Sequence, residues 1–332
     1  MQPGWIDASH RSALLGHLLL ESGDTIEDLY VSYVVHGDLD DRSKPVVLGL
    51  CAIGSTHHRL DFLIGKGRAL DPSLYTIIVV DALGNGLSSS PSSSVTQPRD
   101  EFPRFTIRDM VHSQKLLMEH MQIDNVHAVV GASMGGMQAL QWGVSFPDFM
   151  SHIIALVPMA KTAPWAQAVN EAARLALRAG TSVEPGTVDW SGWVAIMHVL
   201  SMRTPVRFAS DCADVAVSDW LARRSEWWAD QQLDPLDWIY QSWAYDAHDV
   251  GTTTGFAGDT ERALAAIRAK TLIAVPKIDL YNPVDAGIWA ARHIENCRLV
   301  QLASGSGHLA ASEADQDAAG QIDREIQIFL ER

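Results

Sequence analysis

One short segment of this sequence has the residue types and the spacing of an activated nucleophile. Residues 131–135 read Gly-Ala-Ser-Met-Gly, between an apolar segment and a helix-like segment. A serine on a sharp strand-to-helix turn needs small neighbours on both sides, and Gly131 and Gly135 provide them. The Met134 N–H at the helix start could then donate to an oxyanion. We therefore predict a nucleophile at Ser133, against the alternative of a glycine-rich turn with an incidental serine.

A serine hydroxyl is a weak nucleophile, so a base must take its proton and a carboxylate must orient that base. For a nucleophile on this kind of turn, the acid and then the histidine follow the serine along the chain. Asp279 comes just after an apolar run at 271–275, and His308 ends the glycine-rich loop 304–308. We predict that Asp279 is the acid and His308 the base.

Other residues compete for these roles. Asp285 is the nearest rival carboxylate, although its position ahead of a helix fits an N-terminal cap better. His57 and His58 precede the serine, which is the wrong order, and we expect them to line the pocket or to cap a helix. The loop that holds them should supply the second oxyanion donor, a backbone N–H near Ala52 or Ile53.

The elements that must position these residues alternate between strands and helices. Strands are predicted near 16–21, 29–35, 45–51, 75–81, 127–130, 152–157, 271–275 and 298–302, with helices near 108–121, 134–146 and 286–293 and after 311. The first two strands are near-alternating, as at an antiparallel edge, whereas 46–50 and 77–80 are apolar on both faces. The pattern predicts the α/β class, with a mostly parallel eight-stranded sheet and helices on both faces.

The stretch 161–268 interrupts this alternation. Its pattern is helical, and it contains eight of the 11 tryptophans, between Trp165 and Trp243. Strand character resumes after it. We therefore predict a core formed by 1–160 and 269–332, and a helical cap, 161–268, inserted after the sixth strand.

Charge and cysteine content exclude several classes of partner. The net charge of −15 opposes phosphate backbones and anionic membrane surfaces, so neither nucleic acid nor a membrane is expected to bind. The 3 cysteines are far apart and suggest neither a disulfide framework nor a metal site. The chain lacks a signal segment and an apolar run of about 18 to 20 residues. We expect an unprocessed cytoplasmic protein that uses no metal.

Two motifs resemble the homoserine transacetylase family of α/β hydrolases, within a likeness from about residue 18 to 310. They are Ser-Met-Gly-Gly-Met-Gln-Ala-Leu-Gln-Trp at 133–142 and Phe-Thr-Ile-Arg-Asp-Met at 105–110. The resemblance implies the α/β-hydrolase fold, a ping-pong acyl-serine mechanism, a helical lid and a homodimer formed through that lid. It also implies a triad of Ser133, Asp279 and His308, with Met134 and Ile53 as oxyanion donors.

The chain departs from this family at two places and keeps one segment of it. Leu309 follows the predicted histidine where the family has an aspartate for the amino group of homoserine, and a leucine cannot bind an ammonium. Residues 81–88 are closer to the Asp-x-x-Gly-x-Gly-x-Ser stretch of ordinary α/β hydrolases. Arg174 ends Asn-Glu-Ala-Ala-Arg, which resembles the segment that holds the substrate carboxylate in the family. Its alternative interpretation is an exposed helix arginine.

Three functions follow from these observations. In the first, water attacks the acyl-Ser133 ester, and the protein is a carboxylesterase for small acetyl-type esters that needs no cofactor. In the second, it is an O-acetyltransferase with acetyl-CoA as co-substrate. In the third, it is an inactive scaffold that only binds, which the complete triad disfavours. Because Leu309 removes the partner of the ammonium, we favour the esterase.

Overall fold

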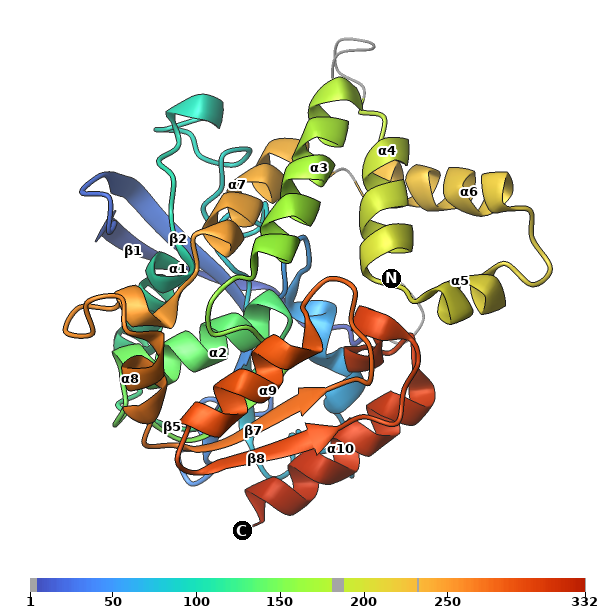
Figure 1. Cartoon of the computed structure of the whole chain (residues 1–332). Coiled ribbons are helices and arrows are strands. Elements are labelled where there is room, and N and C mark those ends of the chain that lie inside the picture. The colour runs from blue at the N-terminus through green and yellow to red at the C-terminus, as the bar shows by residue number, and fades with distance from the viewer. Residues whose placement is uncertain (1–4, 181–187, 232, 332) are drawn as a thin grey trace.

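A single eight-stranded sheet organises the chain in the computed structural model, which describes residues 5–180, 188–231 and 233–331 (Figure 1). Its strands are β1 Arg11–Leu19, β2 Thr25–His36, β3 Val46–Leu50, β4 Thr76–Val80, β5 Val126–Ala132, β6 Met150–Leu156, β7 Lys270–Val275 and β8 Cys297–Gln301. Their order is β1-β2-β4-β3-β5-β6-β7-β8. The β1–β2 and β2–β4 pairs are antiparallel and the other pairs are parallel, which confirms the predicted mostly parallel sheet.

The first strand differs from its prediction, because it covers 11–19 rather than 16–21. It pairs with β2 from Arg11↔Tyr33 to Leu19↔Thr25, with register irregularities on either side of Gly16. At this sheet edge Leu14 and Leu19 are exposed. Apolar residues therefore lie on both the buried and the exposed face of β1, and its extent is set by pairing with β2.

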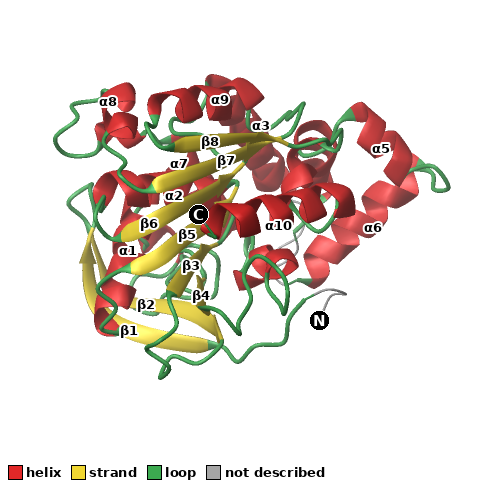
Figure 2. Ribbon diagram, turned by 90° about the horizontal axis from the view of Figure 1, so that it is seen from below, coloured by secondary structure: helices red, strands yellow, loops and turns green. Residues whose placement is uncertain are grey.

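Helices cover both faces of the sheet (Figure 2). On one face lie α10 (Gln316–Leu330) and the 3₁₀ helix η1 (His57–Leu63), which contact each other. On the other lie α1 (Ile107–His120), α2 (Met134–Ser145), α8 (Thr260–Ala265) and α9 (Val284–His293). Covering on both faces explains why every residue of β4 is buried.

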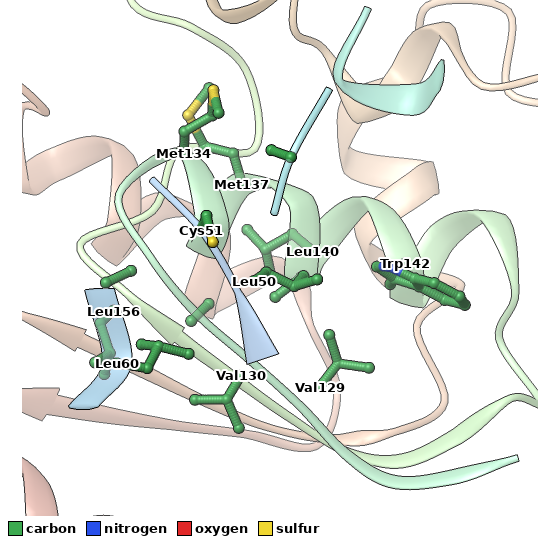
Figure 3. Packing of buried hydrophobic residues seen from close by; sticks show 14 of the residues in the cluster. Leu50, Cys51, Leu60, Val129, Val130, Met134, Met137, Leu140, Trp142 and Leu156 are labelled. Carbon is green, nitrogen blue, oxygen red and sulfur yellow. The ribbon is translucent and has the colours of Figure 1, made fainter. Parts of the chain in front are cut away.

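The helix that follows the predicted nucleophile lies deep in the core (Figure 3). Residues 134–144 of α2 are all buried, and Leu140 packs with Leu50 and Val129. The Trp142 indole N–H donates to Gln114 Oε1 at 2.8 Å. The start of α2 is therefore held by close packing along the whole helix.

Most helices between β6 and β7 lie beyond one edge of the sheet (Figure 1). They are α3 Pro164–Gly180, α4 Ser191–Val194 with a π-helical continuation Ala195–Ser201, α5 Pro205–Asp211, α6 Val217–Asp230 and α7 Pro235–Asp246. The rings of Trp190, Trp193 and Trp228 pack together, with centroids 4.7 Å apart for the closest pair. The last helix of the interval 161–268, α8, packs against α2 and α9. The exact division into core and cap stays a prediction.

The cysteines and the hydropathy of the helices bear on disulfides and membrane spans. Cys51 is buried, Cys212 and Cys297 are partly buried, and all are unpaired. Among the described residues, no helix combines the length and the hydropathy required to cross a membrane.

Candidate active site

The predicted nucleophile lies on a strained turn between β5 and α2. Ser133 has φ 58° and ψ −122°, a conformation that residues other than glycine rarely adopt. A Cβ on Gly131 would lie 2.1 Å from the Gly135 carbonyl oxygen, and one on Gly135 would lie 2.5 Å from the Leu50 oxygen. Both glycines of the motif are therefore required by close backbone approach, as the sequence led us to expect.

The structure brings Ser133, His308 and Asp279 together in one line of hydrogen bonds. His308 Nε2 lies 2.8 Å from Ser133 Oγ, and His308 Nδ1 lies 2.8 Å from Asp279 Oδ2. Asp279 Oδ1 accepts from the backbone N–H groups of Tyr281 at 2.8 Å and Asn282 at 3.0 Å. The carboxylate thus binds Nδ1–H of the histidine, which leaves Nε2 to accept the serine proton.

The rival residues lie elsewhere. Asp285 is exposed in the first turn of α9, and the N-cap of that helix is Pro283, so our expectation that Asp285 caps the helix is wrong. His57 Nδ1 lies 3.2 Å from Asp81, and His58 Nδ1 lies 2.7 Å from Asp61. Both histidines begin η1 without capping it. Their position before the serine in the sequence had excluded them from the triad, and in the structure their imidazoles contact the carboxylates of Asp81 and Asp61.

The loop after β3 holds the two candidates for the second oxyanion donor, Ala52 and Ile53. The Ala52 N–H donates to Ser55 Oγ, and the Gly54 N–H donates to Gln241 Oε1, both at 2.9 Å. Within the described part of the chain, the Ile53 N–H between them has no acceptor. This choice between Ala52 and Ile53 was open in the sequence, and the hydrogen bonding favours Ile53.

Comparison with known proteins agrees with the observed fold. A family described as "alpha/beta hydrolase fold" matches residues 60–315. The chain belongs to this family. It is 30% identical over 338 residues to an ethyl acetate hydrolase of Pseudomonas veronii, across 95% of this chain and 94% of that protein. It is also 30% identical over 356 residues to a homoserine O-acetyltransferase of Methanosalsum zhilinae, across 94% and 70%, which confirms the resemblance to that family.

Among solved structures, this α/β hydrolase is similar to an acetylester hydrolase from Corynebacterium glutamicum. The TM-score is 0.88 at 25% identity, with 98% of this chain and 96% of that chain covered. Relatives of this α/β hydrolase therefore include ester hydrolases and an acetyltransferase. Residues that distinguish water from an alcohol as acyl acceptor have to be found in the site itself.

Arg174 of this α/β hydrolase is buried, so its interpretation as an exposed helix arginine is wrong. Its guanidinium forms ion pairs with Asp246 and Glu171, both at 2.7 Å. Asn170 also donates to Asp246, and the Tyr281 hydroxyl donates to Asn170 at 2.6 Å. The positive charge of Arg174 is thus already paired, in a network that reaches the loop of the catalytic carboxylate.

Leu309 places an apolar side chain directly after His308. It is buried in the 3₁₀ helix Gly307–Ala311, and its N–H donates to the Met202 carbonyl oxygen of the cap at 3.4 Å. The position therefore offers no charge to an amino group of a substrate.

Sequence analysis missed a tyrosine that binds the loop of the catalytic carboxylate. Tyr245, near the end of α7, is fully buried, and its hydroxyl donates to Asn282 Oδ1. The Asn282 side-chain N–H donates to the Val157 carbonyl oxygen at 2.7 Å. No motif marks a tyrosine within a tryptophan-rich helical segment. Asn282, three residues after the predicted acid Asp279, was the one sequence feature that lies next to this tyrosine.

One group among the described residues could ligate a metal ion. Donor atoms of His10, His57 and Asp81 lie within 4.8 Å of one another. Asp81 already accepts hydrogen bonds from the His57 backbone N–H, Ser32 and Asn85. In this structure the carboxylate therefore anchors the loop that contains Ile53.

A pocket lies between the core loops and the cap. Its core side is formed by residues 54–56 with Gly84 and Asn85, and its cap side includes Trp190, Trp228 and Trp238. Gln241 bridges the two sides, because it also donates to the Leu83 carbonyl oxygen at 2.9 Å. The pocket thus begins one residue beyond Ile53.

Proposed function

We propose that the protein hydrolyses short-chain, acetyl-type carboxylic esters through an acyl-Ser133 intermediate. The observation that carries the proposal is the buried hydrogen-bonded line from Ser133 Oγ through His308 to Asp279. Ser133 Oγ attacks the carbonyl carbon while His308 Nε2 takes its proton and later gives it to the departing alcohol. The Met134 and Ile53 N–H groups stabilise the oxyanion. The reaction takes place on protein groups alone and requires no cofactor.

Two features support water as the acyl acceptor. Leu309 offers nothing to an ammonium group, and Arg174 is neutralised by Asp246 and Glu171. Selecting an amino-acid alcohol over water requires contacts to its charges, and truncating such a contact costs about 2 to 5 kcal/mol. The similarity to an ethyl acetate hydrolase also supports hydrolysis.

The alternative is an O-acetyltransferase with acetyl-CoA as co-substrate. It is supported by the similarity to a homoserine O-acetyltransferase over 94% of the chain. It requires Arg174 to release a carboxylate partner and bind that of homoserine.

A side-by-side measurement separates the two. We expect purified protein to release acetate from an acetyl ester at least about thirtyfold faster than it releases CoA from acetyl-CoA with homoserine. Leu309→Asp should raise homoserine-dependent CoA release, whereas the uncharged, similarly shaped Leu309→Asn should not. Efficient CoA release by the wild type that depends on homoserine would overturn the esterase.

We further propose a cytoplasmic homodimer formed through the cap. Leu200, Val206 and Val217 on the cap are 66%, 78% and 51% exposed, which supports a covered surface there. Light scattering should give twice the chain mass for the wild type and the single mass for Val206→Asp. Cell fractionation tests the location.

A further inference from the structure

Gln241 of the cap lies against the loop that holds the second oxyanion donor. It is fully buried on α7, its Oε1 accepts from the Gly54 N–H at 2.9 Å, and its Nε2–H donates to the Leu83 carbonyl oxygen at 2.9 Å. A backbone N–H can only donate and a carbonyl oxygen can only accept, so one orientation of the Gln241 amide satisfies both partners. Trp238 of the same helix also packs on Gly54, where an added Cβ would lie 3.0 Å from its Cδ1 atom. Gln241 thus joins the cap to the loops that follow β3 and β4.

The other end of the loop after β3 is fixed to the nucleophile turn. A Cβ on Gly135 would lie 3.1 Å from the Cys51 carbonyl oxygen, so the end of β3 passes directly over the first turn of α2. From the next turn of α2, the Gln138 Nε2–H donates to the same Cys51 oxygen at 3.0 Å. The Ile53 N–H therefore lies between a peptide fixed by the core, at Cys51, and one fixed by the cap, at Gly54.

The peptide between Ile53 and Gly54 needs a partner outside its own turn. The Ser55 N–H closes this turn by donating to the Ala52 carbonyl oxygen at 3.2 Å. Type I and type II turns differ by a rotation of the central peptide, and glycine accepts both signs of φ; Gly54 has φ 61°. Because both ends of the turn are fixed, rotation of the central peptide has to be accommodated by adjacent torsion angles, which direct the Ile53 N–H. The acceptor on Gln241 selects one orientation.

We propose that Gln241 is a positioning residue for the oxyanion hole, because it keeps the Ile53 N–H in place through the Gly54 peptide. This inference rests on the proposed ester hydrolysis. In the tetrahedral intermediate, the negative oxygen accepts from the Met134 and Ile53 N–H groups, and a donor contributes only where it points at the developing charge. A helix of the cap therefore takes part in building the oxyanion hole.

Two substitutions separate positioning of the donor from support of the fold. Gln241→Glu keeps an oxygen for the Gly54 N–H but places an ionisable group in a buried position beside the Leu83 carbonyl oxygen. Gln241→Met has a similar length and removes both hydrogen bonds without adding a charge. Burying a charge without a partner costs more stability than losing neutral hydrogen bonds. We therefore expect the larger loss of stability in Gln241→Glu and the larger loss of catalysis in Gln241→Met.

The test measures the affinity for an oxyanion separately from the affinity for substrate. In 1,1,1-trifluoroacetone, Ser133 Oγ bonds to the carbonyl carbon, its proton passes to His308 Nε2, and the ketone oxygen takes the negative charge. The inhibition constant of this ketone thus reports the oxyanion donors. In Gln241→Met we expect this constant to rise, and kcat on p-nitrophenyl acetate to fall, by about ten- to a hundredfold, with KM within about threefold. In Gln241→Glu both should stay within about threefold of the wild type, although urea unfolds this variant more easily.

The matched control is Gln141→Met. Gln141 is equally buried, but its Nε2–H donates to the Ser145 hydroxyl at 2.9 Å and the Thr253 hydroxyl at 3.0 Å, away from the loop after β3. The inhibition constant and kcat should stay within about twofold of the wild type, even if stability falls.

An inhibition constant of Gln241→Met within threefold of the wild type overturns the inference. If catalytic loss follows the loss of stability, with Gln241→Glu more affected than Gln241→Met, Gln241 supports the fold alone. Equal rises in Gln241→Met and Gln141→Met overturn the inference even if Gln241→Glu does not fold. If Gln241→Met does not fold, Gln241→Asn replaces it, because its amide is too short to reach both partners. Ester hydrolysis by the wild type that survives Ser133→Ala would instead overturn the proposed function.

Discussion

Asp237 on α7 gives the fold a pH dependence that can be measured. The residue is buried where the cap meets the core, and its carboxylate accepts from the Ser92 backbone N–H at 2.9 Å and from the Ser92 hydroxyl. Burial raises its pKa from 3.8 to about 6, because the hydrogen bonds from Ser92 and the charge of Arg99 only partly offset the lost hydration. We expect Asp237→Asn to stabilise the protein above this pH.

The sign follows from where the proton is bound. Between pH 3.8 and about 6 the folded protein keeps the Asp237 proton and the unfolded chain has lost it, so stability falls as pH rises through this window. At about 1.4 kcal/mol for each pH unit, the loss is complete above pH 6 and amounts to about 3 kcal/mol. Asparagine keeps an oxygen for the Ser92 N–H and has no charge to bury. The gain from Asp237→Asn should be about 1 kcal/mol at pH 4.5 and about 3 kcal/mol at pH 8.

Urea unfolding of wild type and variant from pH 4.5 to 8, followed by tryptophan fluorescence, measures this gain. The cap segment contains eight of the 11 tryptophans, so the signal reports the region that holds Asp237. The control is Asp234→Asn, which removes a charge from the same helix at its N-cap, where the carboxylate pairs with the exposed Arg99. That change should cost at most about 1 kcal/mol. An Asp237→Asn gain that does not grow with pH, or a loss at pH 8, would refute the reasoning.

Three further outcomes test the site. Ser133→Ala should lower kcat on p-nitrophenyl acetate by about 10⁴ or more, and a mutant that kept a tenth of the rate would exclude Ser133 as nucleophile. Asp279→Asn should lower kcat strongly without changing the shape of the site, because it favours the wrong histidine tautomer, while Asp285→Asn should have little effect. A larger loss in Asp285→Asn would show that Asp279 is not the catalytic acid. Arg174→Ala should lower the free energy of unfolding by about 2 kcal/mol because the partly buried Asp246 loses its charge partner and keeps only the hydrogen bond from Asn170. A stable variant with only a raised KM would assign Arg174 to substrate binding instead.

The nucleophile turn could be predicted because its requirements are local. Gly131, Ser133 and Gly135 lie within five residues, and the close backbone contacts that demand glycine arise inside one strand–turn–helix unit. Asp279 and His308 were found because each follows a strand of the parallel part of the sheet, and carboxyl ends of parallel strands meet at one edge of the sheet. The buried strands were recognisable for the same reason, since their apolar runs follow from cover on both faces.

Contacts between distant segments were decided only by the tertiary structure. The extent of β1 depends on pairing with β2, because an edge strand has no hydrophobic pattern of its own strong enough to define it. The burial of Arg174 depends on Asp246, which is brought to it from another helix of the cap. Tyr245 on the cap donates to Asn282 in the loop of the catalytic carboxylate, and this contact depends on the direction of the Asn282 amide. The sequence by itself determined which residues could react, because their motifs are local. The groups that surround them were determined by how the cap packs on the core.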